Sequence, residues 1–234
     1  MAAPTDSTQP ARAQGSASER PIGLVVDWGG VLTAGIADAF TDWAAAEGID
    51  YGHYLAALRT WIGPDAVDPA VNPVHALERG ELEVPEFEQR LAAALSEHGS
   101  TVRAEGLLGR MFAGLELVEE SMIGLVRRAK AQGLRTALLS NSWGNDYPRE
   151  GWDTIFDAVV ISGEVGMRKP EHRIYQHTLA LIDLDPAQAV MVDDLSPNIR
   201  AAVEVGMVGV LHESYDQTRL ELEAVFELDL GPDA

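Results

Sequence analysis

Residues 22–33 read IGLVVDWGGVLT, and this stretch decides the fold. Its first five residues form a short apolar run, which predicts a buried strand. The run stops at Asp27, and the glycine pair at positions 29 and 30 predicts a turn directly after it. The stretch therefore predicts a buried strand that ends in a carboxylate and a turn.

Four more apolar runs end in the same way, in polar or turn-forming residues. They cover residues 134–139, 158–161, 189–192 and 208–211. Helical patterns between them, at residues 118–132, 171–182 and 197–205, predict a parallel sheet that is covered on both faces. Ligands of such sheets bind beyond the carboxyl ends of the strands, where the connection order reverses. Asp27, Ser140, Asp193 and Asp194 are all expected at such ends.

The stretch between residues 34 and 114 breaks this alternation. It holds no clear strand, but helical patterns recur at residues 37–47, 53–61, 73–78 and 85–98, with a turn-rich loop at 63–73. We expect a helical cap at residues 34–114, inserted into a core formed by residues 21–33 and 115–215. Residues 1–20 are expected to form a disordered tail. Residues 216–234 are expected to form an acidic tail with a short helix at 217–227 that then frays.

The composition excludes several classes of function. The chain has 234 residues and a formal net charge of -20, which argues against nucleic acid and anionic lipid as partners. It has no cysteine, so disulfides, thiolate metal sites and cysteine nucleophiles are excluded. Residues 1–20 lack the apolar run of a secretory signal, and no apolar stretch reaches transmembrane length. We therefore expect a soluble, cytoplasmic protein, whose oligomeric state the sequence leaves open.

Four short segments are expected to meet at one edge of the predicted sheet. They are residues 26–33 (VDWGGVLT), 139–141 (LSN), 168–170 (RKP) and 192–194 (VDD). In order and spacing they resemble the motifs of the haloacid dehalogenase-like hydrolase superfamily, over about residues 22–212. The resemblance implies an α/β fold, with a Rossmann-like, doubly wound parallel sheet and a helical cap inserted after the first strand. The cap is similar to the small cap of the subgroup that contains many sugar-phosphate and nucleotide phosphatases.

The aspartates in these segments predict a metal site. Asp27 and Asp194, with help from Asp193, supply the hard oxygen ligands that Mg²⁺ prefers. The resemblance implies that the main-chain carbonyl of Gly29 is a further ligand. The metal would neutralise the oxygens of a small phosphate ester and hold its phosphorus in line with the Asp27 carboxylate.

The remaining motif residues are expected to bind the phosphoryl group. Attack by Asp27 on phosphorus would give an aspartyl-phosphate, which water then hydrolyses. Ser140 is expected to donate its hydroxyl to a phosphoryl oxygen, and Lys169 to balance the charge of the nucleophile and the transferring group. Asn141 and Gly30 complete the expected substrate-binding set.

Gly29 departs from the pattern of the family. Most phosphatases that the sequence resembles carry an aspartate there, which protonates the leaving oxygen and later deprotonates the attacking water. Glycine does neither, although such acid-base help contributes about 100- to 10,000-fold in rate. Three hypotheses stay open: a magnesium-dependent phosphatase, a 2-haloacid dehalogenase-type hydrolase that needs neither metal nor acid, and a non-catalytic phosphoester-binding module. The paired Asp193 and Asp194 favour the phosphatase.

Several other residues have two interpretations each. Trp28 could shape the mouth of a pocket or pack in the core, and Asn198 could support the metal loop or begin a helix. Trp143 and Tyr147 follow Ser140 closely and are placed to line a pocket. Five residues of the expected cap could contact a leaving group, although most side chains of this kind pack in a core. They are Trp43, Tyr51, Tyr54, Trp61 and His75.

Overall fold

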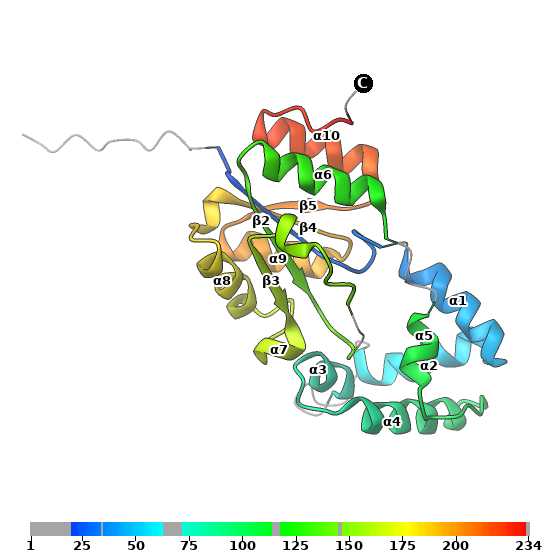
Figure 1. The fold of residues 1–234 in the computed structure, drawn as a ribbon. Coiled ribbons are helices and arrows are strands. Elements are labelled where there is room, and N and C mark those ends of the chain that lie inside the picture. The colour runs from blue at the N-terminus through cyan, green and yellow to red at the C-terminus, as the bar shows by residue number, and fades with distance from the viewer. Residues whose placement is uncertain (1–19, 34, 63–71, 114–117, 145–146, 233–234) are drawn as a thin grey trace, which may run out of the picture.

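The computed structural model describes residues 20–33, 35–62, 72–113, 118–144 and 147–232. Within them lies one sheet of five parallel strands (Figure 1). The strands are β1 (Gly23–Val26), β2 (Arg135–Ser140), β3 (Ala158–Ile161), β4 (Ala189–Asp193) and β5 (Val208–Leu211). Their order is β3-β2-β1-β4-β5, so the connection order reverses at β1. The predicted doubly wound parallel sheet is confirmed.

The register of the strands aligns the carboxyl ends of the three central ones. Val26 of β1 lies opposite Leu138 of β2 and Val192 of β4. Asp27 follows β1 directly and Asp193 is the last residue of β4, so the two aspartates leave the sheet side by side. This reversal point is where doubly wound folds bind their ligands.

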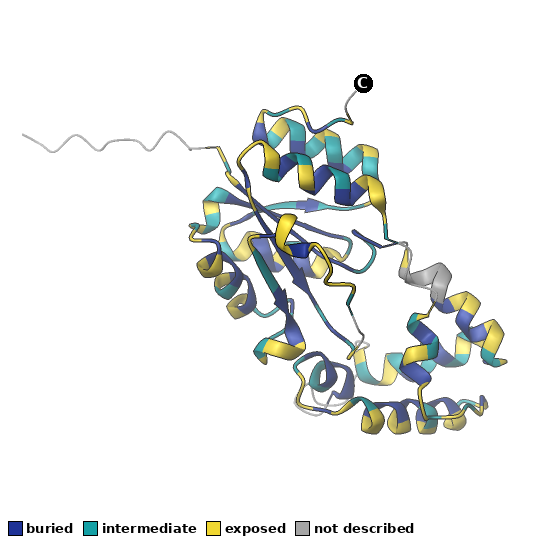
Figure 2. Ribbon diagram, in the orientation of Figure 1, coloured by how far each residue is buried: buried dark blue, intermediate teal, exposed yellow. Residues whose placement is uncertain are grey.

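Successive residues of β1 point to opposite faces of the sheet, and each face carries its own core. Four helices cover the two faces: α6 (Glu120–Ala131) and α10 (Tyr215–Phe226) on one, α8 (His172–Leu181) and α9 (Ser196–Val205) on the other. Leu24 and Val26 pack in the first core and Val25 in the second, all fully buried. Figure 2 shows the central strands as mostly buried. Covered faces allow continuous apolar strands, which is the pattern that the sequence displays.

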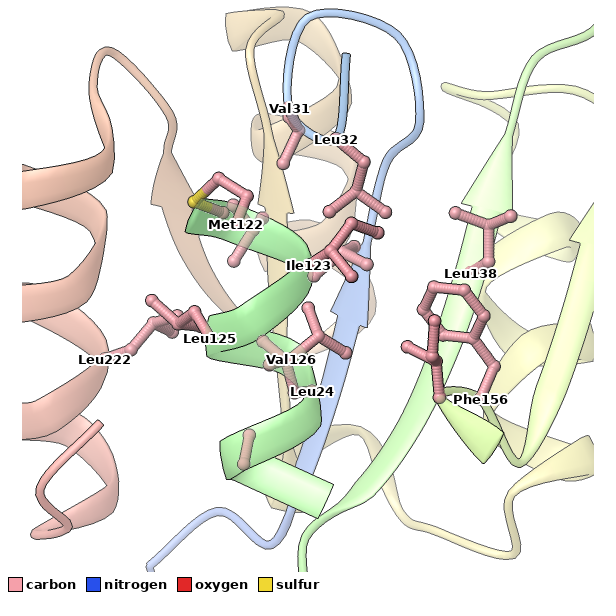
Figure 3. Close-up of a cluster of buried hydrophobic side chains, with 14 of the residues drawn as sticks. Leu24, Val31, Leu32, Met122, Ile123, Leu125, Val126, Leu138, Phe156 and Leu222 are labelled. Atoms are coloured by element: carbon pink, nitrogen blue, oxygen red, sulfur yellow. The ribbon is translucent and has the colours of Figure 1, made fainter. Parts of the chain in front are cut away.

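The C-terminal segment is part of the first core. The helix predicted at 217–227 is present as α10, and Leu222, Phe226 and Leu230 are fully buried. Figure 3 shows Leu222 of α10 facing Leu125 of α6. Nε of Arg128 donates to the main-chain oxygen of Leu230 over 2.8 Å. The structure differs here from the expected fraying, because the buried Leu230 and the hydrogen bond from Arg128 hold the residues after α10 on the core.

Truncating a buried side chain of α10 should destabilise the whole core. Phe226→Ala is expected to lower the free energy of unfolding by about 3–5 kcal/mol, because it opens a cavity in a fully buried cluster. Leu220→Ala on the same helix is the matched control, since Leu220 is 57% exposed and its loss should cost less than about 0.5 kcal/mol. Urea unfolding measures both. Equal stability of the two variants would show that the segment is a dispensable tail.

The segment between β1 and α6 is helical. Its helices are α1 (Ile36–Glu47), α2 (Tyr51–Ile62), α3 (Pro73–Glu78), α4 (Val84–Glu97) and α5 (Leu107–Phe112). They share a hydrophobic cluster of their own, which includes Trp43, Tyr54 and Phe87. Thr33 and Val118 pair in an isolated antiparallel bridge, so the chain leaves and re-enters the sheet region at one point. Figure 1 shows these helices grouped apart from the sheet.

Some expectations fall outside the description or were incomplete. The expected disordered tail, apart from Arg20, and most of the turn-rich loop at 63–73 lie outside the described residues. Two helices were not predicted, α5 and the short α7 (Ser162–Val165). The boundaries of the other α-helices lie within two residues of those predicted. Among the described residues, no helix is both long and apolar enough to cross a bilayer.

Candidate active site

Three carboxylates gather where β1 and β4 end. Oxygen atoms of Asp27, Asp193 and Asp194 all lie within 4.8 Å of one another. The main-chain N–H of Asp27 donates to the oxygen of Val192 over 3.0 Å, which carries the β1–β4 pairing one residue beyond the strand. Asp27 and Asp193 are buried, whereas Asp194 is half-buried and forms the open side of the cluster.

Lys169 provides the positive charge inside this cluster. Its Nζ lies 2.8 Å from Oδ1 of Asp27 and 2.6 Å from Oδ2 of Asp193, and only 1% of the lysine is exposed. Three carboxylates and one ammonium leave a formal charge of -2 when all are ionised. The cluster is therefore short of positive charge, and its oxygen donors fit a hard dication such as Mg²⁺.

Asn141 holds the loop that carries Lys169. Its Nδ2 donates to the main-chain oxygen of Lys169 over 3.0 Å, and its Oδ1 accepts from the N–H of Lys169 over 2.8 Å. The sequence predicted that Asn141 binds substrate. In the structure its side-chain amide is engaged with the chain itself, so it fixes the position of the lysine.

Asp193 is held from three sides. Besides the contact with Lys169, its Oδ1 accepts a hydrogen bond from the N–H of Leu195 over 2.8 Å. Nδ2 of Asn198 donates to both of its carboxylate oxygens, over 2.9 and 3.0 Å. Asn198 is buried in the first turn of α9, so its two interpretations combine: it begins the helix and supports the carboxylate loop. Asp193 therefore orients its neighbours, while Asp194 keeps its carboxylate more accessible.

Gly30 is shaped by its contact with Asp194. Its φ is +75°, and a Cβ there would lie 2.5 Å from Oδ2 of Asp194, so only glycine fits. Its N–H donates to Oγ1 of Thr33 over 3.2 Å. Gly30 thus lets the turn after β1 approach Asp194 on the open side of the cluster.

Burial and mutual repulsion disfavour ionised carboxylates here. Burial raises the pKa of Asp27 to about 7; Lys169 opposes this shift, and Asp193 and Asp194 add to it. Burial and the charge of Asp193 raise the pKa of Asp194 to about 6. Burial alone would lower the pKa of Lys169, but Asp193 and Asp27 outweigh it, so the lysine stays charged. A bound cation would stabilise the ionised form of both aspartates and so lower their pKa values.

Ser140 and Tyr147 form the other side of the site. Ser140, the last residue of β2, is buried, and its Oγ lies 3.0 Å from the Tyr147 hydroxyl. The Tyr147 ring packs edge-on against Trp28 and Trp152, with centroids 6.0 and 5.9 Å apart. Trp28 is itself buried in the first core, so it packs and does not form a pocket mouth. The contact between Ser140 and Tyr147 could not be predicted from the sequence, because a hydroxyl pair has no characteristic spacing.

The helical segment is tied to the loops of the site. Glu78, buried at the end of α3, accepts from Trp143 Nε1 over 3.1 Å and from Nε of Arg168. Arg79 Nε donates to Oε1 of Glu171 over 2.7 Å. Arg168 and Glu171 flank Lys169 and Pro170, so two ion pairs connect α3 to the lysine loop. Sequence reasoning missed both pairs, which join residues about 90 positions apart.

The aromatic residues singled out in the cap mostly pack. Trp43 and Tyr54 are buried in the hydrophobic cluster that α1 to α5 share, and Tyr51 and Trp61 pack against it. Trp143 also packs on this cluster, against Phe87 and Phe112, so it joins the cap to the core instead of lining a pocket. His75 is half-buried beside Arg168 and Arg79, and burial together with these charges lowers its pKa to about 4.

Comparisons with known proteins agree with this architecture. A family model for haloacid dehalogenase-like hydrolases matches residues 23–206. A sesquiterpene phosphatase of Aspergillus oryzae is 34% identical over 57% of this chain and 68% of its own length. A phosphoglycolate phosphatase of Psychrobacter arcticus is 25% identical over 65% of each protein. The chain spans only 20% to 29% of three further curated relatives.

Solved structures show the same fold. A haloacid dehalogenase family enzyme of Bacteroides thetaiotaomicron, crystallised with magnesium and inorganic phosphate, aligns with a TM-score of 0.62 and 18% identity. The alignment covers 82% of this chain and 94% of that one. The family match spans most of the described core and contains every predicted motif. The chain therefore belongs to the haloacid dehalogenase-like hydrolases.

Proposed function

We propose that this hydrolase is a Mg²⁺-dependent phosphatase that cleaves a small phosphate monoester through an aspartyl-phosphate on Asp27. The cluster of three carboxylates around one buried lysine carries the proposal, because its excess negative charge favours a dication. The paired Asp193 and Asp194 favour a metal site, which a 2-haloacid dehalogenase does not need. The similarity to a phosphatase and the magnesium and phosphate of the structural neighbour support the same choice.

The proposed metal-binding groups are the carboxylates of Asp27 and Asp194 and the main-chain oxygen of Gly29. Mg²⁺ at this position would neutralise phosphoryl oxygens and favour an ionised nucleophile. Asp193 contributes to the same field but is engaged with Lys169, Leu195 and Asn198, so we assign it the positioning of the lysine.

The chain's own groups then perform the transfer. One Asp27 oxygen attacks phosphorus, the bond from phosphorus to the ester oxygen breaks, and water later hydrolyses the acyl phosphate. The Ser140 hydroxyl donates a hydrogen bond to a phosphoryl oxygen, and Lys169 stabilises the negative charge of the attacking carboxylate. Because Gly29 has no side chain, the departing oxygen takes its proton from water. Esters with acidic leaving groups should therefore react fastest.

A panel of esters tests this proposal. Phosphate release should be measured from an aryl phosphate, acetyl phosphate, sugar phosphates and nucleotides, with Mg²⁺ and with a chelator, beside halide release from a 2-haloacid. We expect phosphate release that the chelator abolishes, and no halide. Halide release that the chelator leaves unchanged would establish the dehalogenase. Tight phosphoester binding without turnover under any metal would establish the binding module.

Metal binding should depend on pH. Asp27 and Asp194 have pKa values raised to about 7 and 6, so Mg²⁺ must displace protons from them below neutral pH. Each displaced proton makes the apparent affinity rise about tenfold per pH unit below the relevant pKa and level off above it. Titration calorimetry between pH 5.5 and 8 measures this rise. An affinity independent of pH would mean that the ion binds elsewhere.

A further inference from the structure

One carboxylate of the helical segment contacts two loops of the site at once. Glu78, at the end of α3, accepts a hydrogen bond from Nε1 of Trp143 over 3.1 Å and pairs with Nε of Arg168. Trp143 follows Asn141 by two residues, and Arg168 directly precedes Lys169. We propose that Glu78 positions Lys169 for phosphoryl transfer, so that the reaction depends on a residue outside the core. Lys169 has here the role that the proposed function gives it.

The contacts of Glu78 close a ring that contains the lysine. The side-chain amide of Asn141 bonds both main-chain groups of Lys169, over 2.8 and 3.0 Å, and Arg168 is the neighbour of Lys169 in the chain. Glu78 joins the two remaining ends of this ring, Trp143 and Arg168. Asn141 thus holds the lysine loop from the core, and Glu78 holds it from the helical segment. Loss of the Glu78 charge would open the ring beside the lysine.

A second ion pair contacts the same loop two residues after the lysine. Nε of Arg79 donates to Oε1 of Glu171 over 2.7 Å. The N–H of Glu171 donates to the main-chain oxygen of Arg168 over 2.9 Å, so residues 168–171 form a closed turn. The side chains of the Arg79 pair are 21% and 23% exposed, against 13% and 8% for Arg168 and Glu78. Because the Glu78 pair is the more buried one, breaking it should disturb the turn more.

The position of Lys169 leaves little tolerance for movement of this turn. Its Nζ lies 2.8 Å from Asp27 and 2.6 Å from Asp193, and the residue is almost fully buried. From this place its charge can stabilise the attacking carboxylate without first moving. A displacement of about 1 Å in a catalytic site can lower the rate by about 100-fold. Movement of the turn that carries the lysine should therefore lower kcat with every ester.

Lysine labelling tests the position of Lys169 without turnover. The sequence contains two lysines, so the half-buried Lys130 is an internal reference for Lys169. Brief treatment with N-hydroxysuccinimide acetate, followed by mass spectrometry, gives the ratio of acetylation at the two residues. We expect Glu78→Gln to raise the Lys169 to Lys130 ratio severalfold, although glutamine keeps the size of the side chain and can still accept from Trp143. A ratio equal to that of the wild type would overturn the proposal.

Hydrolysis of acetyl phosphate in Mg²⁺ tests the effect on the reaction. Glu78→Gln should lower kcat about 10- to 100-fold and change KM less than about threefold, because the groups proposed to bind phosphate are unaltered. Glu47→Gln is the matched control, since it breaks a pair with Arg110 that is 2.7 Å long and lies within the helical segment. It should change neither kcat nor the labelling ratio. A wild type without turnover would refute the proposed function, whereas the labelling ratio still decides whether Glu78 holds the lysine.

A double variant separates positioning from loss of stability. In Glu78→Gln alone, the mostly buried Arg168 keeps its charge without this partner, which by itself destabilises the fold. Arg168→Met in the same chain removes that charge, so the free energy of unfolding should recover. The labelling ratio and kcat should stay at the values of the single variant, because the contact that holds the lysine loop is still absent. Recovery of kcat together with stability would overturn the proposal, since the unpaired charge alone would then explain the loss.

Discussion

Asp27→Asn is expected to lower phosphatase turnover by on the order of 10⁴-fold or more, with every ester that the wild type hydrolyses. Asparagine has nearly the same shape, so it can still accept the N–H of Trp28, which lies 2.7 Å from Oδ1 of Asp27. Its amide oxygen is a poor nucleophile and cannot form the acyl phosphate. The loss should therefore appear in kcat, measured by phosphate release at saturating substrate.

Asp157→Asn is the matched control for this variant. Asp157 also pairs with a lysine, Lys130, over 3.0 Å, but it precedes β3 and so lies at the opposite end of the sheet. Its kcat should stay within about twofold of the wild type, because the residue is remote from the chemistry. Full activity of Asp27→Asn would remove Asp27 from the mechanism.

Gly29→Asp is expected to raise turnover of unactivated alkyl phosphates by up to about 100-fold, the lower end of what a general acid contributes. Gly29 is not among the described residues with positive φ, unlike its neighbour Gly30, so its φ angle does not require glycine. Aryl phosphates should gain little, because their leaving groups need no proton. The measurement is kcat for a series of esters whose alcohols differ in pKa.

Gly29→Asn separates acid catalysis from packing. It introduces a side chain of the same size that cannot donate a carboxylic proton, so it should give no gain on alkyl phosphates. Equal effects of aspartate and asparagine would show that the site already has an acid or that a side chain at this position reaches no leaving group.

Most of the sheet could be predicted from the sequence. Each of the five apolar runs became a strand, because a sheet covered on both faces buries every position of its strands. The ends of those runs also located Asp27, Ser140, Asp193 and Asp194 at one edge, since parallel strands end on the same side. The pattern of neighbouring residues was sufficient to predict the strands and the polar residues at their ends.

The contacts between distant segments could not be predicted in this way. The role of Asn141 depends on the path of the lysine loop, and Glu78 meets Arg168 only after the cap folds against the core. Leu222 and Phe226 looked like part of an acidic tail, because their apolar stripe is surrounded by charged residues in sequence. Tertiary packing decides such contacts, and one sequence carries no direct record of it.

Trapping the covalent intermediate tests directly whether Asp27 is the nucleophile. The protein should be mixed with Mg²⁺ and acetyl phosphate, quenched in acid during turnover, and digested for mass spectrometry. The expected result is one added phosphoryl group on the peptide that contains Asp27, absent with chelator and absent in Asp27→Asn. Turnover with phosphate on another residue, or with no phosphorylated peptide at any quench time, would contradict it.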